Sequence, residues 1–233
     1  MRSFHQKRNR TFTERLFNFS TIAWLIIVTV IISVLAFVLF SISEDYFNYL
    51  ALKPSNILQG KYLWTLLTHI FVHGSFAHLL INMFVLFSLG GLCEKIIGRK
   101  RFIWVYLISG LFAGILSVVL AGAFGNSELG ARIFGSPEIF MVGASGAIFA
   151  IAGLYVMLLP RLKFMIIFLP FFSLPAYIMV PAMLAVMWIL SIIGNWPIGN
   201  VAHFGGFLAG IIYGLCLRIK YKNKIKKLQR FFH

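Results

Sequence analysis

Long runs of apolar residues alternate with short polar or glycine-containing segments along this chain. A helix that spans a membrane needs roughly 20 mostly apolar residues, and the pattern predicts six such helices. They are Ile22–Ser43, Phe76–Cys93, Phe102–Gly122, Ala144–Leu159, Pro175–Ile193 and Val201–Leu217. The expected fold class is therefore an all-α polytopic membrane protein, built as a bundle of six transmembrane helices.

Two apolar stretches are longer than one span and contain breaks. Tyr62–Gly91 would measure roughly 45 Å as a helix, and it is interrupted by Gly74, which precedes a serine suited to an N-cap. We therefore expect Tyr62–His73 to form an interfacial or re-entrant segment before the second span. Phe164–Ile193 contains three prolines, so we expect Phe164–Ser173 to be interfacial or packed against the bundle.

Composition supports the membrane assignment. Of the 233 residues, 60% are hydrophobic and 12% are charged, whereas a soluble domain has about 45–50% apolar and about 25% charged residues. This balance excludes a soluble globular enzyme and a disordered chain. The predicted organisation is a basic N-terminal arm over residues 1–21, a membrane domain over residues 22–217 and a basic tail over residues 218–233.

The net charge of +15 arises from 21 basic and 6 acidic side chains. Eighteen of the basic residues lie in the N-terminal arm, the second and fourth loops and the tail, and the other three are Lys53, Lys61 and Arg132. Because cytoplasmic segments carry the excess of Lys and Arg, we expect a multi-pass protein of the cell membrane with both termini cytoplasmic. This topology explains the charge without a nucleic-acid partner, and the tail is suited to anionic lipid of the bilayer.

Few polar side chains lie inside the predicted spans, and each is a functional candidate because polar groups are costly at membrane depth. His78 and Asn82 share one face of the second span, Ser145 opens the fourth, and His203 lies in the first turn of the sixth. The structural alternative is that His78 and Asn82 make interhelical hydrogen bonds and that Ser145 is an N-cap.

A catalytic role would explain all four polar residues together. The fourth and sixth spans both start at the outer face, so we expect Ser145 and His203 at a similar shallow depth, where the imidazole could activate the hydroxyl. Small residues at helical spacing would let the two helices approach closely. These are Gly206, Gly210 and Gly214 in the sixth span and Gly146, Ala150 and Gly153 in the fourth. The N-terminus of the fourth helix, with donors from His78 and Asn82, would stabilise an oxyanion.

Other hydrolytic mechanisms lack the residues that they need. The single aspartate, Asp45, lies in the first outer loop, and no carboxylate lies in the middle of a span, which excludes a buried triad and an aspartyl protease. No lysine lies at the depth of Ser145, and no histidine is followed by glutamate as a zinc protease motif requires. His69 and His73, four residues apart, leave a different metal site open as the lesser alternative, and we predict neither cofactor nor metal.

With these residues in order, the chain resembles the rhomboid family of intramembrane serine proteases, over roughly Tyr62 to Gly214. The matching motifs are His78-x-x-x-Asn82, Gly90-Gly91-Leu92-Cys93-Glu94-Lys95, Gly143-x-Ser145-Gly146 and Ala202-His203-x-x-Gly206-x-x-x-Gly210. The resemblance implies the six-helix rhomboid-like bundle of the prokaryotic form. It also implies Ser145 as nucleophile, His203 as general base and then acid, and an oxyanion hole formed by His78, Asn82 and the backbone N–H of Ser145.

The resemblance further implies that Gly143 opens the turn before the nucleophile, with Gly146, Phe149 and Gly206 in supporting positions. The implied substrates are transmembrane segments of other membrane proteins, cleaved near the outer membrane surface. Two positions depart from the family pattern, because Trp64-Thr65 stands where members often carry Trp-Arg and Phe149 where a tyrosine is common. The alternative function is a catalytically silent relative that binds or chaperones transmembrane segments, and the intact pair of Ser145 and His203 favours the protease.

Overall fold

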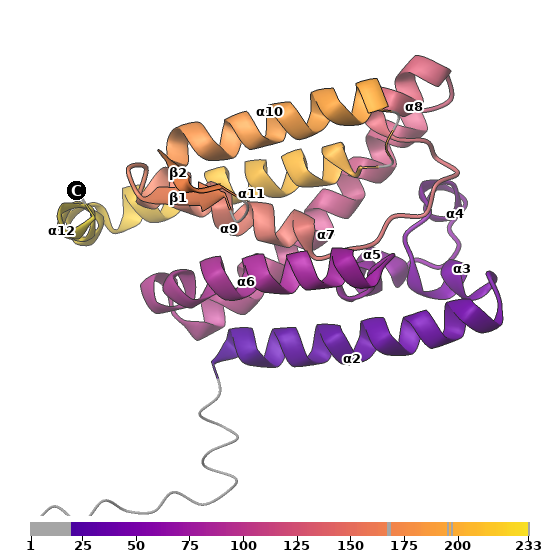
Figure 1. The fold of residues 1–233 in the computed structure, drawn as a ribbon, viewed down its shortest axis with the longest axis horizontal. Coiled ribbons are helices and arrows are strands. Elements are labelled where there is room, and N and C mark those ends of the chain that lie inside the picture. The colour runs from indigo at the N-terminus through magenta and orange to yellow at the C-terminus, as the bar shows by residue number, and fades with distance from the viewer. Residues whose placement is uncertain (1–19, 167–168, 195, 197, 233) are drawn as a thin grey trace, which may run out of the picture.

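The computed structural model describes residues 20–166, 169–194, 196 and 198–232, which form a bundle of helices (Figure 1). Five helices are long and apolar enough to cross a membrane, namely α2 (Thr21–Ile42), α6 (Phe76–Ile97), α7 (Arg99–Phe124), α10 (Ala176–Gly194) and α11 (Asn200–Lys220). A shorter apolar helix, α9 (Ser145–Leu158), lies where the fourth span was expected. The predicted class, a polytopic helical membrane protein, is confirmed.

Short elements mark the two ends of the bundle. Three short helices, α3 (Tyr46–Leu50), α4 (Pro54–Leu58) and α8 (Glu128–Phe134), lie at one end, which we call the α8 end. The hairpin of β1 (Lys163–Ile166) and β2 (Leu169–Pro175) and the terminal helix α12 (Lys222–Phe231) lie at the opposite end, the α12 end (Figure 1). The tail predicted for residues 218–233 thus includes the last turn of α11 as well as α12.

Serine and glycine residues set the boundaries of α6. The hydroxyl of Ser75 accepts the backbone N–H of His78 and caps the helix, as the sequence predicted. Tyr62–His73 is accordingly separate from α6, and it contains α5 (Thr65–Thr68) and the 3₁₀ helix η1 (His69–Phe71). Gly98, with a φ of +86°, ends α6 and allows α7 to begin at the next residue, because glycine adopts positive φ without strain.

The proline-containing segment before α10 forms strands, which the helical pattern did not anticipate. Lys163 pairs with Pro175 and Met165 with Ser173 in an antiparallel register, while residues 167–168 lie outside the described part of the chain. Proline lacks a backbone donor and disfavours helix, so the remaining polar backbone groups find partners across a hairpin instead.

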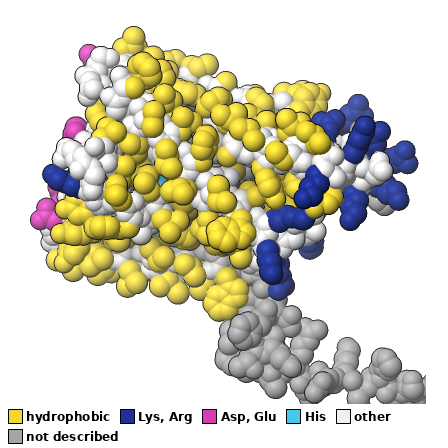
Figure 2. Space-filling view, turned by 180° about the vertical axis from the view of Figure 1, so that it is seen from behind, with side chains coloured by type: hydrophobic (Ala, Val, Ile, Leu, Met, Phe, Trp, Pro, Cys, Tyr) yellow, Lys and Arg dark blue, Asp and Glu magenta, His cyan; other side chains and the backbone are white. Residues whose placement is uncertain are grey.

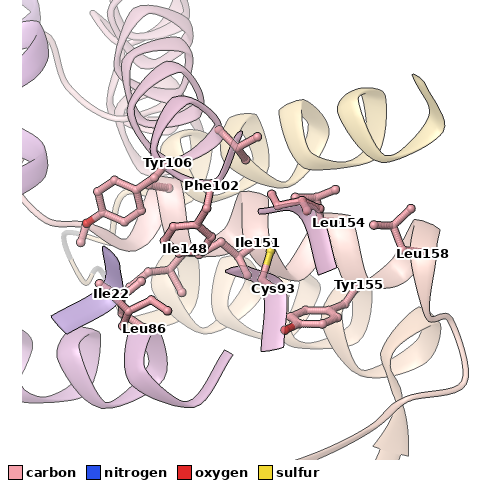
Figure 3. Close-up of a cluster of buried hydrophobic side chains, with 14 of the residues drawn as sticks. Ile22, Leu86, Cys93, Phe102, Tyr106, Ile148, Ile151, Leu154, Tyr155 and Leu158 are labelled. Carbon is pink, nitrogen blue, oxygen red and sulfur yellow. The ribbon is translucent and has the colours of Figure 1, made fainter. Parts of the chain in front are cut away.

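The core of the bundle surrounds α9. Figure 3 shows buried side chains of α2, α6, α7 and α9 meeting in one cluster, with Leu86, Phe102 and Ile151 among its fully buried members. The outward faces of the long helices carry exposed apolar side chains instead, which cover the flank of the molecule (Figure 2). Burial at the centre and apolar exposure outside are what a lipid environment requires of a helical bundle.

Charge separates along the long axis of the molecule. Figure 2 shows Lys and Arg side chains gathered at the α12 end and Asp and Glu side chains mostly at the opposite end. The second loop, the fourth loop and the tail therefore share one end, which agrees with the predicted grouping of basic residues. The predicted N-terminal arm falls almost wholly on residues 1–19, which lie outside the described residues.

Candidate functional site

Helices α9 and α11 bring the predicted nucleophile and base together. Ser145 is the first residue of α9 and His203 is the fourth residue of α11. The hydroxyl oxygen of Ser145 lies 2.8 Å from Nε2 of His203. In the tautomer with its proton on Nδ1, the imidazole accepts the hydroxyl hydrogen at Nε2, which is the geometry that general-base activation requires.

The His203 ring is held by packing instead of by a carboxylate. The ring is buried, and its Nδ1 atom makes no hydrogen bond within the described part of the chain. Phe149, one turn beyond Ser145, lies against the ring with centroids 4.8 Å apart and planes inclined by 33°. The phenyl ring thus supports one face of the imidazole.

A row of glycines explains how α9 and α11 come so close. We call it the glycine seam, and it consists of Gly146, Ala150 and Gly153 on α9 with Gly206 and Gly210 on α11. A Cβ atom added to Gly206 would overlap the carbonyl oxygen of Gly146, and one added to Gly210 would overlap that of Ala150. Contact between two helix backbones is possible only where side chains are absent or minimal, so the spacing noted in the sequence is used as a packing surface.

The turn before Ser145 also needs glycine. Gly143 has a φ of +125°, in the region that residues with a Cβ rarely adopt. Its N–H donates to the carbonyl oxygen of His69 at 2.9 Å, and a Cβ at this position would lie 2.9 Å from Cε1 of His78. The His78 ring therefore lies directly beside the turn, next to the start of α9.

Of the two predicted side-chain oxyanion donors, His78 reaches the site and Asn82 is otherwise engaged. His78 lines the same cavity as Ser145 and His203. Asn82 is buried one turn along α6, where its amide donates to the carbonyl oxygen of His78 at 2.9 Å, and it is absent from the cavity lining. Its predicted role requires the amide to turn toward Ser145.

The pair of Ser145 and His203 opens onto a cavity of about 870 Å³. Its walls come from α6, α7, α8, α10 and the starts of α9 and α11, with the loop over residues 135–143. Glu128, Arg132 and Ser136 contribute polar groups to the lining from the α8 side, and small residues such as Gly110 and Ala113 line it from α7. The cavity is large enough for a peptide segment and for the water that hydrolysis consumes.

Helix α9 begins part-way along the neighbouring helix α7. A Cβ on Gly146 would lie 2.9 Å from the Cβ of Ala113, and Ala113 is eleven residues (124 − 113) before the end of α7 at Phe124. Eleven helical residues correspond to about 16 Å. α9 has only 14 residues and therefore begins level with the middle of α7, while the shallow membrane depth expected for Ser145 and His203 stays a prediction.

Ser33 of α2, which sequence reasoning missed, supports the turn at Gly143 through His73. Ser33 Oγ donates to the carbonyl oxygen of Phe71 at 2.9 Å and lies 3.0 Å from Nδ1 of His73. Nε2 of His73 in turn lies 3.5 Å from the backbone nitrogen of Ala144. The sequence did contain a signal for such a contact, because Thr29 and Ser33 are polar residues four positions apart in an apolar run. Both are fully buried in the structure.

Burial keeps the histidines of this loop neutral. Loss of solvent, with a smaller effect from the charge of His78, lowers the pKa of His73 to about 3. Burial also lowers the pKa of His69 to about 4, against an opposing hydrogen bond to the Thr65 carbonyl. A neutral His73 can accept at Nε2 while it donates at Nδ1, as its position requires. No group of three potential metal ligands occurs among the described residues.

The pair Trp64-Thr65 is anchored by neutral hydrogen bonds. Nε1 of Trp64 donates to the carbonyl oxygen of Tyr49 at 2.9 Å. The buried hydroxyl of Thr65 donates to the carbonyl oxygen of Tyr62 at 2.8 Å. The Trp64 contact ties the segment before α6 to α3, and the Thr65 contact closes a turn within the segment, without the guanidinium group that the family pattern often has at the second position.

Comparison with known proteins supports the resemblance to the rhomboid family. A family model described as the rhomboid domain matches residues 60–220. Rhomboid protease GlpG of Haemophilus influenzae is 27% identical over 185 residues, which cover 78% of this chain and 84% of that protein. RHOMBOID-like protein 5 of Arabidopsis thaliana is 32% identical over 171 residues, 73% of this chain and 48% of that protein. The human mitochondrial presenilin-associated rhomboid-like protein is 32% identical over 146 residues, 61% of this chain and 35% of that protein. The alignments thus span less than half the length of the last two relatives.

Proposed function

The chain belongs to the rhomboid family, and from this premise we propose that it is an intramembrane serine endopeptidase that cleaves transmembrane segments of other membrane proteins. The observation that carries the proposal is the 2.8 Å contact between Ser145 Oγ and His203 Nε2, in the lining of a cavity inside a membrane-spanning bundle. Because His203 has no carboxylate partner among the described residues, the proposed catalytic unit is a dyad.

The proposed reaction proceeds through an acyl-enzyme. Ser145 Oγ attacks the scissile carbonyl carbon while His203 Nε2 takes the hydroxyl proton, and the C–N bond then breaks as His203 returns that proton to the leaving amine. Water next attacks the ester and gives its proton to His203. The ester bond to Ser145 breaks, the acid product leaves, and the hydroxyl recovers its proton.

The negative oxygen of each tetrahedral intermediate needs donors that are already in place. The backbone N–H of Ser145 lies at the N-terminus of α9, where the helix dipole favours negative charge. His78 is beside the Gly143 turn and supplies a ring N–H. Asn82 adds a donor once its amide turns from the carbonyl of His78, which is a change of one side-chain rotamer in our proposal.

We further propose that the α12 end faces the cytoplasm of a cell membrane. The basic residues gathered there support this orientation. The cavity, which extends toward α8, then receives substrate and water from the outer side, and cleavage occurs toward the outer membrane surface. The same proposal includes the division of the chain into an N-terminal arm over residues 1–21, a membrane domain over residues 22–217 and a tail over residues 218–233.

The decisive test is cleavage of a model transmembrane substrate by the purified protein in lipid vesicles. We expect the native chain to cleave and to react with a fluorophosphonate probe, and we expect Ser145→Ala to lose both properties. Ser88→Ala is a matched control, because the Ser88 hydroxyl is exposed and bonds only to its own helix at Phe84. Cleavage that persists in Ser145→Ala would overturn the proposal. A native chain that binds the substrate without cutting it would favour the silent, chaperone-like alternative.

A further inference from the structure

Helix α12 is docked on the bundle and does not extend freely from it. Its Ile225 side chain is buried, and Leu228 packs against the same apolar cluster that surrounds α9. Nε2 of Gln229 donates to the carbonyl oxygen of Leu158 at 3.0 Å, in the last turn of α9. The apolar side of α12 is therefore already occupied, which leaves its polar side for contacts outside the chain.

That polar side is uniformly basic. All the charged residues of α12 are exposed lysines or arginines, namely Lys222, Lys224, Lys226, Lys227 and Arg230. Like charges at such spacing repel one another. An amphipathic helix whose apolar face is docked and whose other face is cationic fits an anionic surface.

The charges converge most strongly at Tyr221, between α11 and α12. The guanidinium of Arg101 lies 5.2 Å from the centre of the Tyr221 ring, and the ammonium groups of Lys220 and Lys224 lie 5.8 Å and 5.9 Å from it. Arg101 also donates to the tyrosine hydroxyl at 2.8 Å. We call these four residues the Tyr221 cluster, and they come from the start of α7, the end of α11 and the start of α12.

The Tyr221 cluster has no counter-charge within the described residues. The ion pairs found there are Lys53–Glu138, Arg99–Glu94 and Arg132–Glu128, and none of them includes Arg101, Lys220 or Lys224. Contact with an aromatic face offsets only part of the repulsion between three cations. The cluster is therefore preorganised for an anion.

The surroundings of the cluster identify the kind of anion. On the same face of α7 as Arg101, one and two turns into the bundle, Trp104 and Ile108 are exposed and apolar. On α11, Ile219 is 72% exposed immediately before Lys220. A group of cationic side chains next to an exposed apolar surface is complementary to a lipid, whose phosphate would contact the cations while its acyl chains lie along the apolar side chains. A soluble anion would leave the apolar part unused.

We propose that the Tyr221 cluster is a binding site for the phosphate of an anionic phospholipid in the leaflet at the α12 end. Arg101 presents paired N–H donors to phosphate oxygens, and Lys220 and Lys224 supply charge from the other two helices. Bound phosphate would relieve the repulsion that opposes docking of α12. Through Gln229, the same lipid would stabilise the far end of the helix that carries Ser145.

The test measures lipid binding on the full chain and does not depend on proteolysis. The purified protein in a zwitterionic detergent is titrated with phosphatidylglycerol, with phosphatidylcholine or with inorganic phosphate, and thermal unfolding and native mass spectrometry are recorded. We expect saturable stabilisation and retained lipid with phosphatidylglycerol alone. Equal stabilisation by inorganic phosphate would show a site for free anions, and equal effects of the two lipids would show no site for anionic lipid. Either result would overturn the proposal.

Two variants that lose the same number of positive charges distinguish binding at the Tyr221 cluster from a general effect of surface charge. The triple variant Arg101→Gln, Lys220→Gln and Lys224→Gln should bind phosphatidylglycerol at least about tenfold more weakly, given the contribution of each basic residue near anionic lipid. The triple variant Lys222→Gln, Lys226→Gln and Lys227→Gln loses the same charge and should change affinity less than about threefold. Equal losses in the two variants would overturn the proposal. If the first variant does not fold, Lys220→Gln and Lys224→Gln singly must each weaken binding, and Lys220→Arg with Lys224→Arg must retain it.

Discussion

Helices α9 and α10 both border the cavity, yet they are held in opposite ways. Ten of the 14 residues of α9 are buried, against five of the 19 residues of α10. α9 meets α11 backbone to backbone along the glycine seam, whereas α10 contains Pro181 within the helix, which removes an internal hydrogen bond. The helix that carries Ser145 is thus enclosed by its neighbours, and α10, which also lines the cavity, is mostly exposed.

The difference separates two requirements of a protease inside a membrane. A serine and a histidine must keep hydrogen-bonding distance, which a rigid pair of helices provides. A transmembrane substrate must also reach that pair from the lipid, which requires a wall that moves. The contacts of α10 near the cavity are few, and one is the hydrogen bond from Trp188 Nε1 to the carbonyl oxygen of Ile133. We therefore expect α10 to be the movable wall.

The largest predicted effect comes from breaking the rigid pair. Gly206→Ala places a Cβ against the carbonyl oxygen of Gly146, and separation of α9 from α11 should cost about 3 kcal/mol or more and abolish cleavage. Thermal unfolding and the cleavage assay measure both effects. Gly91→Ala is the matched control, because a Cβ there has no atom within 4 Å. A stable, active Gly206→Ala protein would show that the seam does not set the geometry.

Acid should destabilise the segment before α6, whose His69 carbonyl accepts the N–H of Gly143 next to the start of α9, and should leave α10 unaffected. Because burial lowers the pKa of His69 to about 4, below the ordinary value of about 6.5, the unfolded chain binds the proton first. The stabilisation is therefore complete above pH 6.5 and is lost as the pH falls from 6.5 toward 4. For His69 alone the loss is about 2 kcal/mol at pH 5.

Thermal unfolding between pH 8 and pH 5 checks the acid prediction. α10 contains no histidine or carboxylate, so it should not contribute, and the share of the loss that belongs to the segment before α6 is measured with a His69 variant. In His69→Gln the dependence on pH should be smaller than in the native chain, even if the variant is less stable at pH 8. An unchanged pH dependence would contradict the assignment to His69.

A smaller effect is expected from removing the aromatic support of the base. Phe149→Ala eliminates the ring contact with His203, which is worth about 0.5–1.5 kcal/mol. We expect kcat to fall up to about tenfold with KM nearly unchanged, because the substrate does not contact the far side of the imidazole. Phe87→Ala removes an exposed phenylalanine of α6 and should leave kcat unaltered. A change in KM alone would argue that Phe149 contacts substrate.

The smallest predicted effect tests the movable wall. Trp188→Phe removes one hydrogen bond between α10 and the residue Ile133, so thermal stability should fall slightly, by about 1 kcal/mol. If opening of α10 limits the rate, cleavage of a transmembrane substrate should rise about two- to fivefold. Trp104→Phe, at an exposed position of α7, serves as control. A lower stability with unaltered cleavage would remove α10 from the entry step.

The sequence was sufficient for the helical layout and for the proximity of Ser145 and His203. Apolar runs of sufficient length located all the long helices, and the spacing of Gly206 and Gly210 identified the face that meets α9. These features are periodic and local, so they can be recognised without knowledge of distant contacts. The pairing of Ser145 with His203 followed from topology, because both residues open helices that run in the same direction.

Features that depend on distances across the bundle could not be obtained in this way. The depth of Ser145 depends on where α9 begins relative to α7, which hydropathy does not record. The link from Ser33 to His73 joins residues 40 positions apart, and Asn82 could bond equally well to its own helix or across it. The prolines of Phe164–Ser173 signalled a break, but a hairpin requires a pairing partner that only the folded chain supplies.

The four-residue repeat of the glycine seam has a consequence for how the bundle assembles. If α11 slid by four residues along α9, Gly210 would face Gly146 and Gly214 would face Ala150, so the same small residues would still fit. Such a slip is about 6 Å, which would carry His203 out of reach of Ser145. The glycine seam alone therefore does not distinguish the observed registry of α9 and α11 from one displaced by four residues. At the cavity end the bond of Ser145 to His203 joins α9 to α11, and the bond of Asn200 to Ser191 holds the start of α11 to α10. The reacting groups therefore also select the registry of α9 and α11 during assembly.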